Sequence, residues 1–371
     1  MRHHIMAGCD VHEKSLVLAW AVDREAPRRR CFSNDAAGRE RLLGSLQEQA
    51  AGDGAETTIW LVYEASSQGY GLYDELRAAG IAAFVLAPTR LNRSVKARAQ
   101  KTDTKDAELL LAILRGHVLA GNELPHIWAP DAATREHREL VRARLAVGQK
   151  ASAVKAEVQM LLKRQGRRRP AALKRPWTGA HRAWLRGLAS GTELPTGARL
   201  ALGTLLRQLA LAEEEVALLD QEVAALALTD RYRAPVAAIT DFAGVGLLTA
   251  MVLLSELGDL SRFANRRRLA AYVGLAPRSA ESGEATDRKG RITRQGSSRL
   301  RAVLCQCAWS RLRVDPEARA RYERIKRRNP KAAKKAVVAL MRTLLIRLWH
   351  AGQAAQAASG VFIDPQTGEA A

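Results

Sequence analysis

Short apolar runs and amphipathic segments alternate along the N-terminal third of the chain, which is the pattern of an α/β domain. The apolar runs have the length and composition of β-strands and lie at 5–10, 16–22, 30–33, 58–64 and 81–87. Helical periodicity begins after Asn34, which we expect to cap that helix, and it occurs again at 70–79 and 104–119. The predicted order is βββαβαβα, a mixed α/β domain at 1–130.

Long helical patterns replace the strands after residue 130. Apolar side chains recur with heptad spacing in two stretches, at Leu140, Val147, Val154 and Leu161 and then at Leu202, Leu205, Leu209, Val216, Leu219, Val223 and Leu226. This spacing predicts a coiled-coil arm at 131–230, whose second helix returns antiparallel to the first, either within one chain or across a dimer. The core of an ordinary helix bundle is the alternative.

The remaining chain is predicted to form a mostly helical domain at 231–355 and a flexible tail at 356–371. Gly244 and Gly246 precede an apolar run at 247–257. This pattern is similar to a helix-hairpin-helix element, in which glycines let backbone N–H groups approach a DNA phosphate. Further helices are expected at 265–273, 297–312 and 331–350, with a loop at 277–296.

The net charge of the chain indicates what kind of partner it binds. The 371 residues include 59 Lys and Arg against 38 Asp and Glu, a formal net charge of +21, and such an excess favours nucleic acid as the partner. Hydrophobic residues at 47% and charged residues at 26% exclude global disorder. The four cysteines form no CxxC pair and no apolar run reaches the roughly 20 residues that a bilayer requires, so we expect a cytoplasmic protein without membrane segments. Met1 and Met6 both fit a native start.

Four carboxylates stand where the predicted elements begin or end. Asp10 and Glu64 close predicted strands, and Asp103 and Asp106, three residues apart, share one face at the start of a helix. Carboxylates at strand ends can converge on such a helix, and an oxygen-only ligand set favours Mg²⁺ or Mn²⁺ for phosphoryl transfer. Helix capping is the alternative role for the two helical carboxylates.

A basic cluster ends the first long helical pattern. Its members are Lys163, Arg164, Arg167, Arg168 and Arg169. At the tip of an arm the cluster would be exposed, and we predict that it clamps phosphates of RNA or DNA; a merely solvated surface is the alternative. Aromatic residues, at 5%, are too few for a protein that binds single strands mainly by stacking.

Several short motifs occur together in this chain. The N-terminal part contains Cys9-Asp10-Val11, Tyr63-Glu64-Ala65, Gly69-Tyr70-Gly71 and the KTDTKDA run at 101–107. The C-terminal part contains LAAYVGLAPR at 269–278, Ser282-Gly283 and the run at 290–296. In combination they resemble the DEDD insertion-sequence transposases over residues 7–308, a family related to invertases of pilin genes.

The resemblance implies a RuvC-like ribonuclease H fold and a recombinase that a noncoding bridge RNA guides to donor and target DNA. The family's metal-binding acids correspond to Asp10, Glu64, Asp103 and Asp106. We further expect a homo-oligomer, a dimer or a tetramer.

The nucleophilic serine of the family corresponds to Ser282, which would form a serine–DNA ester. Relatives often have two serines before the motif glycine, whereas this chain has a single one preceded by Glu281, so Ser279 is the alternative nucleophile. No histidine lies nearby to activate a hydroxyl. We therefore expect this loop to dock at the metal-bearing carboxylates, where an arginine stabilises the phosphate: Arg278, Arg288 or Arg291.

Two other functions fit parts of the pattern. A junction resolvase or nuclease would use the same carboxylates with water as nucleophile, and an invertase of the same family would use the same chemistry for another outcome. A binding protein without enzymatic activity would need the carboxylate quartet to be a structural remnant.

Overall fold

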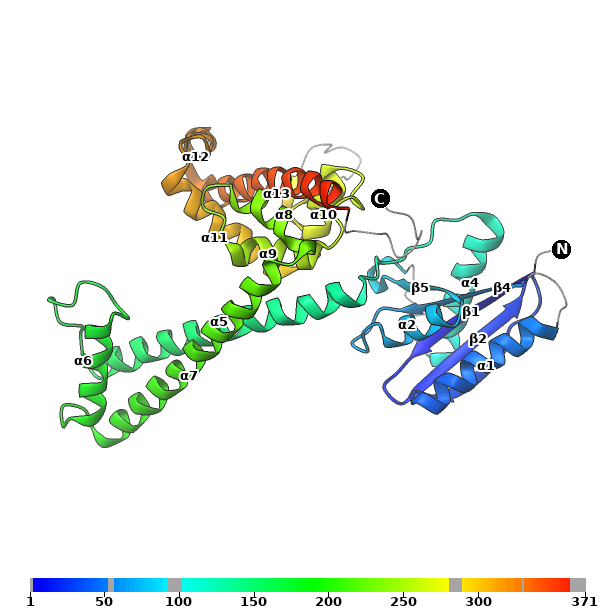
Figure 1. Ribbon diagram of the computed structural model, residues 1–371, viewed down its shortest axis with the longest axis horizontal. Helices are drawn as coiled ribbons and strands as arrows, with labels where there is room; N and C mark the ends of the chain where they lie inside the picture. Colours follow the sequence, from blue (N-terminus) through cyan, green and yellow to red (C-terminus); the bar gives the residue numbers. More distant parts are fainter. Residues whose placement is uncertain (1–2, 53–56, 92–101, 280–288, 329, 361–371) are drawn as a thin grey trace. The chain divides into compact units, whose positions relative to one another are not determined.

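The computed structural model describes residues 3–52, 57–91, 102–279, 289–328 and 330–360. The chain forms two compact units, Met1–Ala129 and Pro130–Ala371 (Figure 1). None of the described helices combines the length and the apolar character that crossing a bilayer requires.

A five-stranded sheet is the centre of the first unit. Its strands lie in the order β3-β2-β1-β4-β5, and their bounds are β1 His3–Val11, β2 Ser15–Val22, β3 Arg28–Ser33, β4 Thr57–Glu64 and β5 Ala82–Leu86. The pairs β1–β2 and β2–β3 are antiparallel, whereas β1–β4 and β4–β5 are parallel. This mixed sheet is consistent with a ribonuclease H-like domain, and it confirms the predicted order of elements.

Helices cover both faces of this sheet (Figure 1). Helices α1 (Ala36–Gly52) and α2 (Gly71–Ala78) bury Leu42, Leu46 and Leu76 against one face. Helix α4 (Asp103–Ala120) packs on the other face, and a short 3₁₀ turn, η1 (Pro88–Arg90), follows β5. At Gly8 the backbones of β1 and α4 meet, because a Cβ there would lie 2.3 Å from the Ala107 carbonyl oxygen.

The cap of α1 differs from the prediction. Asp35, not Asn34, accepts a hydrogen bond from the Gly38 amide, at 2.7 Å. The Asn34 side chain instead donates to the carbonyl oxygen of His12, at 2.6 Å. Asn34, which was expected to cap α1, therefore stabilises the turn between β1 and β2 instead.

Three helices form an arm in the second unit: α5 (Ala132–Arg164), α6 (Gly179–Ser190) and α7 (Thr196–Ala227). Arg144 of α5 pairs with Asp220 of α7 at 2.7 Å, and Lys155 pairs with Glu213 at 2.8 Å. Residue numbers rise along α5 as they fall along α7, so the two helices are antiparallel within one chain (Figure 1). A supercoil of the two helices stays a prediction.

The rest of the second unit is a helical bundle. Its helices are α8 (Asp230–Thr240), α9 (Leu247–Leu257), α10 (Arg266–Val273), α11 (Ser298–Val314), α12 (Pro316–Arg328) and α13 (Ala333–Ser359), with a 3₁₀ turn η2 (Pro330–Ala332). Helix α9 is buried from Ala250 onward. A turn containing Gly244 at φ +79° joins α8 to α9, and phosphate binding by this hairpin stays a prediction.

Helix α12 of the bundle was not predicted, and two further regions differ from the prediction. The region predicted as a loop at 277–296 contains a hairpin of β6 (Pro277–Ser279) and β7 (Lys289–Ile292). Residues 356–359 belong to α13 and not to a flexible tail, because Gln356 is buried. Its side chain accepts from the Leu260 amide at 3.0 Å and donates to the Gly258 carbonyl at 3.2 Å.

Candidate functional site

Two of the predicted carboxylates lie at one edge of the first unit's sheet. Cys9 of β1 pairs with Tyr63 of β4 in the parallel register, so Asp10 and Glu64 follow as neighbours. Cys9 and Tyr63 belong to the core under α1 and α2. Because side chains alternate along a strand, Asp10 and Glu64 point to the face that α4 covers.

The other two carboxylates lie in the first turn of α4. Thr102 caps this helix, and its hydroxyl accepts from the Lys105 amide at 3.4 Å. Asp103 is therefore not the cap, and its side chain is 55% exposed, whereas Asp106 is 7% exposed. The close contact at Gly8 brings the start of this helix to the edge that carries Asp10 and Glu64.

His12 joins this cluster, although the sequence pattern placed it only in a polar turn. Its Nε2 lies 3.2 Å from Asp10 Oδ2 and 3.4 Å from Asp103 Oδ1. One ligand atom from each of these three residues lies within 4.8 Å of the others. Strand alternation could not have identified His12, because this residue lies in the turn after β1 and meets the carboxylates only in the folded domain.

The donor set fits a divalent cation. Two carboxylates and an imidazole converge, and the Asp10 side chain is only 13% exposed. Glu64 is the register neighbour of Asp10, and Asp106 follows Asp103 in the first turn of α4, but neither belongs to the group whose ligand atoms lie within 4.8 Å of one another. Oxygen donors suit Mg²⁺ and Mn²⁺, and the imidazole nitrogen adds affinity for transition metals. Burial, with a smaller contribution from Asp10, raises the pKa of the Cys9 thiol, so this neighbour stays protonated and offers no thiolate. We name this group of five residues the carboxylate edge: Asp10, His12, Glu64, Asp103 and Asp106.

The predicted nucleophile belongs to the chain segment between β6 and β7. Ser282 and Arg288 lie outside the described residues, and Ser279 is the last residue of β6. Arg278 and Arg291 are exposed on the two paired strands, and Arg278 Nη2 donates to the Thr293 carbonyl at 3.5 Å.

Two glycines hold the base of this hairpin against the end of α10. A Cβ on Gly274, at φ +76°, would lie 2.3 Å from the Gln295 carbonyl oxygen. A Cβ on Gly296, at φ +115°, would lie 1.9 Å from the Tyr272 carbonyl oxygen. The YVGL run thus closes the hairpin, because only glycine permits this backbone conformation and this close approach.

The basic cluster lies where α5 ends. Lys163 and Arg164 form the last turn of α5, and Arg167, Arg168 and Arg169 follow in the loop. Arg167 is paired with Glu193, at 3.3 Å between Nη1 and Oε2. The other four side chains are exposed and have no ion pair among the described residues.

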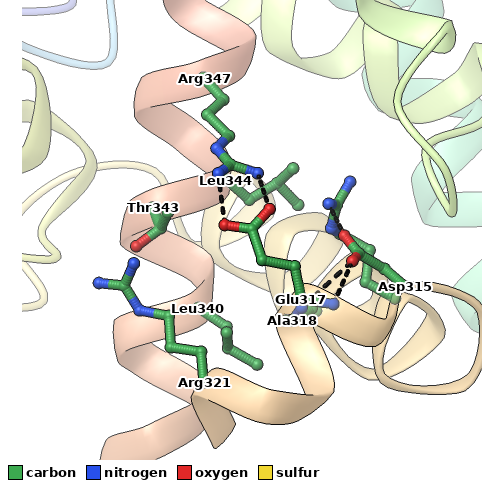
Figure 2. Close-up of a pocket in the computed structure, with 10 residues that line it drawn as sticks. Asp315, Glu317, Ala318, Arg321, Leu340, Thr343, Leu344 and Arg347 are labelled. Carbon is green, nitrogen blue, oxygen red and sulfur yellow. Dashed lines mark hydrogen bonds and ion pairs between the residues drawn. The ribbon is translucent and has the colours of Figure 1, made fainter.

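A crevice between α11, α12 and α13 has a different character (Figure 2). Arg347 donates to both carboxylate oxygens of Glu317, at 3.0 and 2.8 Å, and Arg311 pairs with Asp315. The cavity measures about 30 Å³, room for water only. These ion pairs fasten three helices together and leave no space for a ligand.

Comparisons with known proteins place the chain in a family. The model described as "Transposase IS116/IS110/IS902 family" matches residues 236–323, and a DEDD transposase model of the IS110 type matches residues 7–165. The protein y4rJ of Sinorhizobium fredii, which has the word transposase in its name, is 30% identical over 338 residues, or 85% of this chain and 83% of y4rJ. The chain belongs to the IS110 family of insertion-sequence transposases.

Two further relatives extend this result. A second protein of Sinorhizobium fredii, y4qE, also named a transposase, is 33% identical over 252 residues, which cover 68% of this chain and 58% of y4qE. The transposase for insertion sequence element IS1533 of Leptospira borgpetersenii is 22% identical over 311 residues, 83% of this chain and 86% of that protein. In this IS110-family transposase, residues 166–235 lie between the two ranges that the family models match, and they include Arg167, Arg168 and Arg169, α6 and the whole of α7.

Proposed function

We propose that this transposase cleaves and rejoins DNA of an insertion sequence in a metal-dependent reaction at the carboxylate edge. The observation that carries the proposal is the convergence of Asp10, His12 and Asp103 within 4.8 Å, with Glu64 as the register neighbour of Asp10. Family membership supplies the DNA substrate class, and the net charge of +21 is consistent with it.

The residues that would hold the cation are Asp10, Glu64, Asp103 and Asp106, with His12 as a further ligand or as a hydrogen-bond donor to the carboxylates. A bound Mg²⁺ or Mn²⁺ supplies positive charge that stabilises a phosphate in its transition state. The protein's own contribution is rigidity, because the strand register fixes Asp10 beside Glu64 and the helix cap fixes Asp103.

Ser282 is the proposed nucleophile in a transesterification. Its Oγ attacks phosphorus, a phosphoserine bond forms and one P–O bond to the sugar breaks. The serine loses its proton and the departing sugar oxygen gains one. Attack by a sugar hydroxyl of the partner strand reverses these steps, so rejoining needs no external energy source. Arg278, Arg288 and Arg291 are the proposed partners of the phosphate charge.

We further propose that a bridge RNA directs the reaction to donor and target DNA and that the active form is a homo-oligomer in the cytoplasm. The support is the family resemblance and the exposed basic side chains at the end of α5, four of which have no ion pair in the described part of the chain. RNA sequenced after purification of the protein from cells checks the first part. Recovery of random transcripts, with no enrichment from the element's noncoding flank, would contradict RNA guidance.

The decisive assay for the chemistry is a denaturing gel of labelled donor DNA incubated with protein, flank-derived RNA and Mg²⁺. Wild type is expected to give a covalent protein–DNA adduct, Ser282→Ala none, and Ser279→Ala the same adduct as wild type. Peptide mapping to Ser279 would move the nucleophile to that residue. Cleavage without any adduct in either wild type or Ser282→Ala would show that water attacks, as in a resolvase or nuclease.

A further inference from the structure

The arm of the second unit contains a cavity at the end away from the bundle. It measures about 510 Å³ and lies where α5 ends, between the loop that carries Arg167, Arg168 and Arg169 and the start of α6. Its walls include Leu162, Lys163, Arg168, Arg169, Trp177 and His181. The volume lies within the roughly 300–1,000 Å³ typical of ligand pockets. We name this cavity the arm-end pocket.

The backbone of the arm-end pocket is held in an unusual conformation at Trp177. This residue has φ +65°, a value that bulky side chains rarely adopt. Its amide donates to His181 Nδ1 at 3.0 Å, and its carbonyl accepts from Arg182 Nε at 3.0 Å. The Lys155 ammonium lies 5.6 Å from the ring centroid. Strain that the surroundings enforce in this way is typical of a side chain placed for binding.

The His181 imidazole is a neutral donor in this wall. The ring is 5% exposed, and burial, with the charges of Arg169 and Arg182, lowers its pKa. Because Nδ1 accepts from the Trp177 amide, the proton of the neutral ring is on Nε2. The wall therefore contains the Trp177 ring beside a neutral imidazole whose position the Trp177 amide fixes.

The charge of the arm-end pocket is entirely positive. Lys163, Arg168 and Arg169 line it, and none of its lining residues is acidic. Arg168 and Arg169 are exposed and have no ion pair among the described residues. A ligand that satisfies this wall combines a flat ring with hydrogen-bonding groups and negative charge, which is the chemistry of a nucleotide.

We propose that the arm-end pocket binds one unpaired nucleotide of a nucleic acid, with the base against Trp177 and the flanking phosphates on Arg168, Arg169 and Lys163. The proposal rests on the proposed function only in that the protein handles nucleic acid, and it is independent of the cleavage chemistry. The base comes from a loop of an RNA or from a displaced DNA strand, which share this chemistry.

The test measures binding of fluorescent oligonucleotides to the full-length protein. Three probes of one sequence are used: single-stranded RNA, single-stranded DNA and a blunt DNA duplex, each single strand also made with one abasic position. We expect Trp177→Leu to weaken single-strand binding about 5- to 100-fold, because stacking on one aromatic ring contributes that much per base. Trp177→Phe should retain most of the affinity, and Trp309→Leu, at an exposed tryptophan of α11, should leave it unchanged.

The abasic probe and the salt dependence complete the test. On wild type the abasic strand should bind as weakly as the intact strand binds to Trp177→Leu, and Arg168→Ala with Arg169→Ala should reduce the logarithmic salt slope by about 0.7 per lost contact. Tighter RNA binding assigns the site to an RNA loop, and tighter DNA binding assigns it to a displaced strand.

Two results would overturn the proposal. One is equal affinity of wild type for intact and abasic strands. The other is unchanged single-strand affinity in Trp177→Leu with the fold intact by circular dichroism. Neither result bears on the adduct assay, whose failure would in turn leave these affinities unchanged.

Discussion

In the first unit, acidic side chains lie at the ends of hydrogen-bonded strands and at a capped helix start, whereas in the second unit basic side chains lie at the end of α5 and in the loop that leads to α6. The carboxylate edge draws its geometry from backbone register, and Asp10 is only 13% exposed. The arm-end pocket draws its geometry from one strained residue and one buried histidine. Both positions are fixed, but by different means.

The two regions suit two different tasks, cation chemistry and the recognition of nucleic acid. A cation needs ligand atoms within a few tenths of an ångström of set positions, and a sheet edge provides that precision. A nucleic acid backbone needs charge spread over a surface, which exposed arginines on a loop provide. Substitutions at the carboxylate edge should therefore change cleavage or cation binding and leave the affinity for nucleic acid unchanged.

The largest effect is expected from the carboxylates themselves. Asp10→Asn and Asp103→Asn should each lower DNA cleavage by about 10²–10³-fold or more, because each removes charge from the cation site. Their affinity for RNA and DNA should equal that of wild type, since the basic surface is intact. The control is Glu40→Gln, an exposed carboxylate on α1. Full cleavage activity in either asparagine variant would remove that residue from the site.

Gly8→Ala should separate α4 from β1. The new methyl group would meet the Ala107 carbonyl oxygen at 2.3 Å, and overpacking of this kind costs about 1–3 kcal/mol of the free energy of unfolding. Gly44→Ala in α1 is the matched control, because no atom lies within 4 Å of its Cβ and alanine favours a helix by about 0.5–1 kcal/mol. Urea unfolding measures both. Equal stability of the two variants would show that the close approach of α4 to Gly8 does not contribute to the free energy of unfolding.

His12→Ala should weaken Mn²⁺ binding about 10–100-fold, the range found when a residue supporting a metal site is removed. Calorimetric titration with Mn²⁺ measures this change. Glu13→Gln, an exposed neighbour in the same turn, should bind Mn²⁺ as wild type does. If His12→Ala also binds normally, the imidazole is no part of the site.

The smallest effect is expected at Glu213, which ties α7 to α6 and α5. A hydrogen bond from Arg182, with help from Lys155, lowers the pKa of Glu213 to about 2 from an ordinary 4.5. A lowered carboxyl pKa stabilises the fold above pH 4.5, and this stabilisation is lost as pH falls through about 2. Glu213→Gln should therefore cost about 1 kcal/mol at neutral pH, after allowance for solvent screening, and nothing in strong acid. Tryptophan fluorescence during acid and urea titrations follows this difference, and an identical pH profile in the variant would contradict it.

The sequence predicted the strand-end carboxylates because their positions follow from local pattern. A run such as TIWLVYE ends at its carboxylate, and parallel strands bring such ends together. The role of Asn34 was predicted wrongly, since the neighbouring aspartate caps α1 equally well and only the contact with His12 distinguishes the two.

The features that sequence reasoning missed depend on tertiary contacts. His12 joins the carboxylate edge through a turn, and Trp177 lines a cavity that exists only once α5, its loop and α6 have folded together. Helix α12 was missed because eight of its thirteen residues are charged, so its apolar periodicity is weak.

The most direct test of the central claim is the number of Mn²⁺ ions bound to the protein alone, measured by electron paramagnetic resonance. Wild type and Glu40→Gln are expected to bind Mn²⁺ alike, whereas Asp10→Asn and Asp103→Asn are expected to lose that binding. Unchanged Mn²⁺ binding in both asparagine variants would contradict the assignment of the carboxylate edge as a cation site.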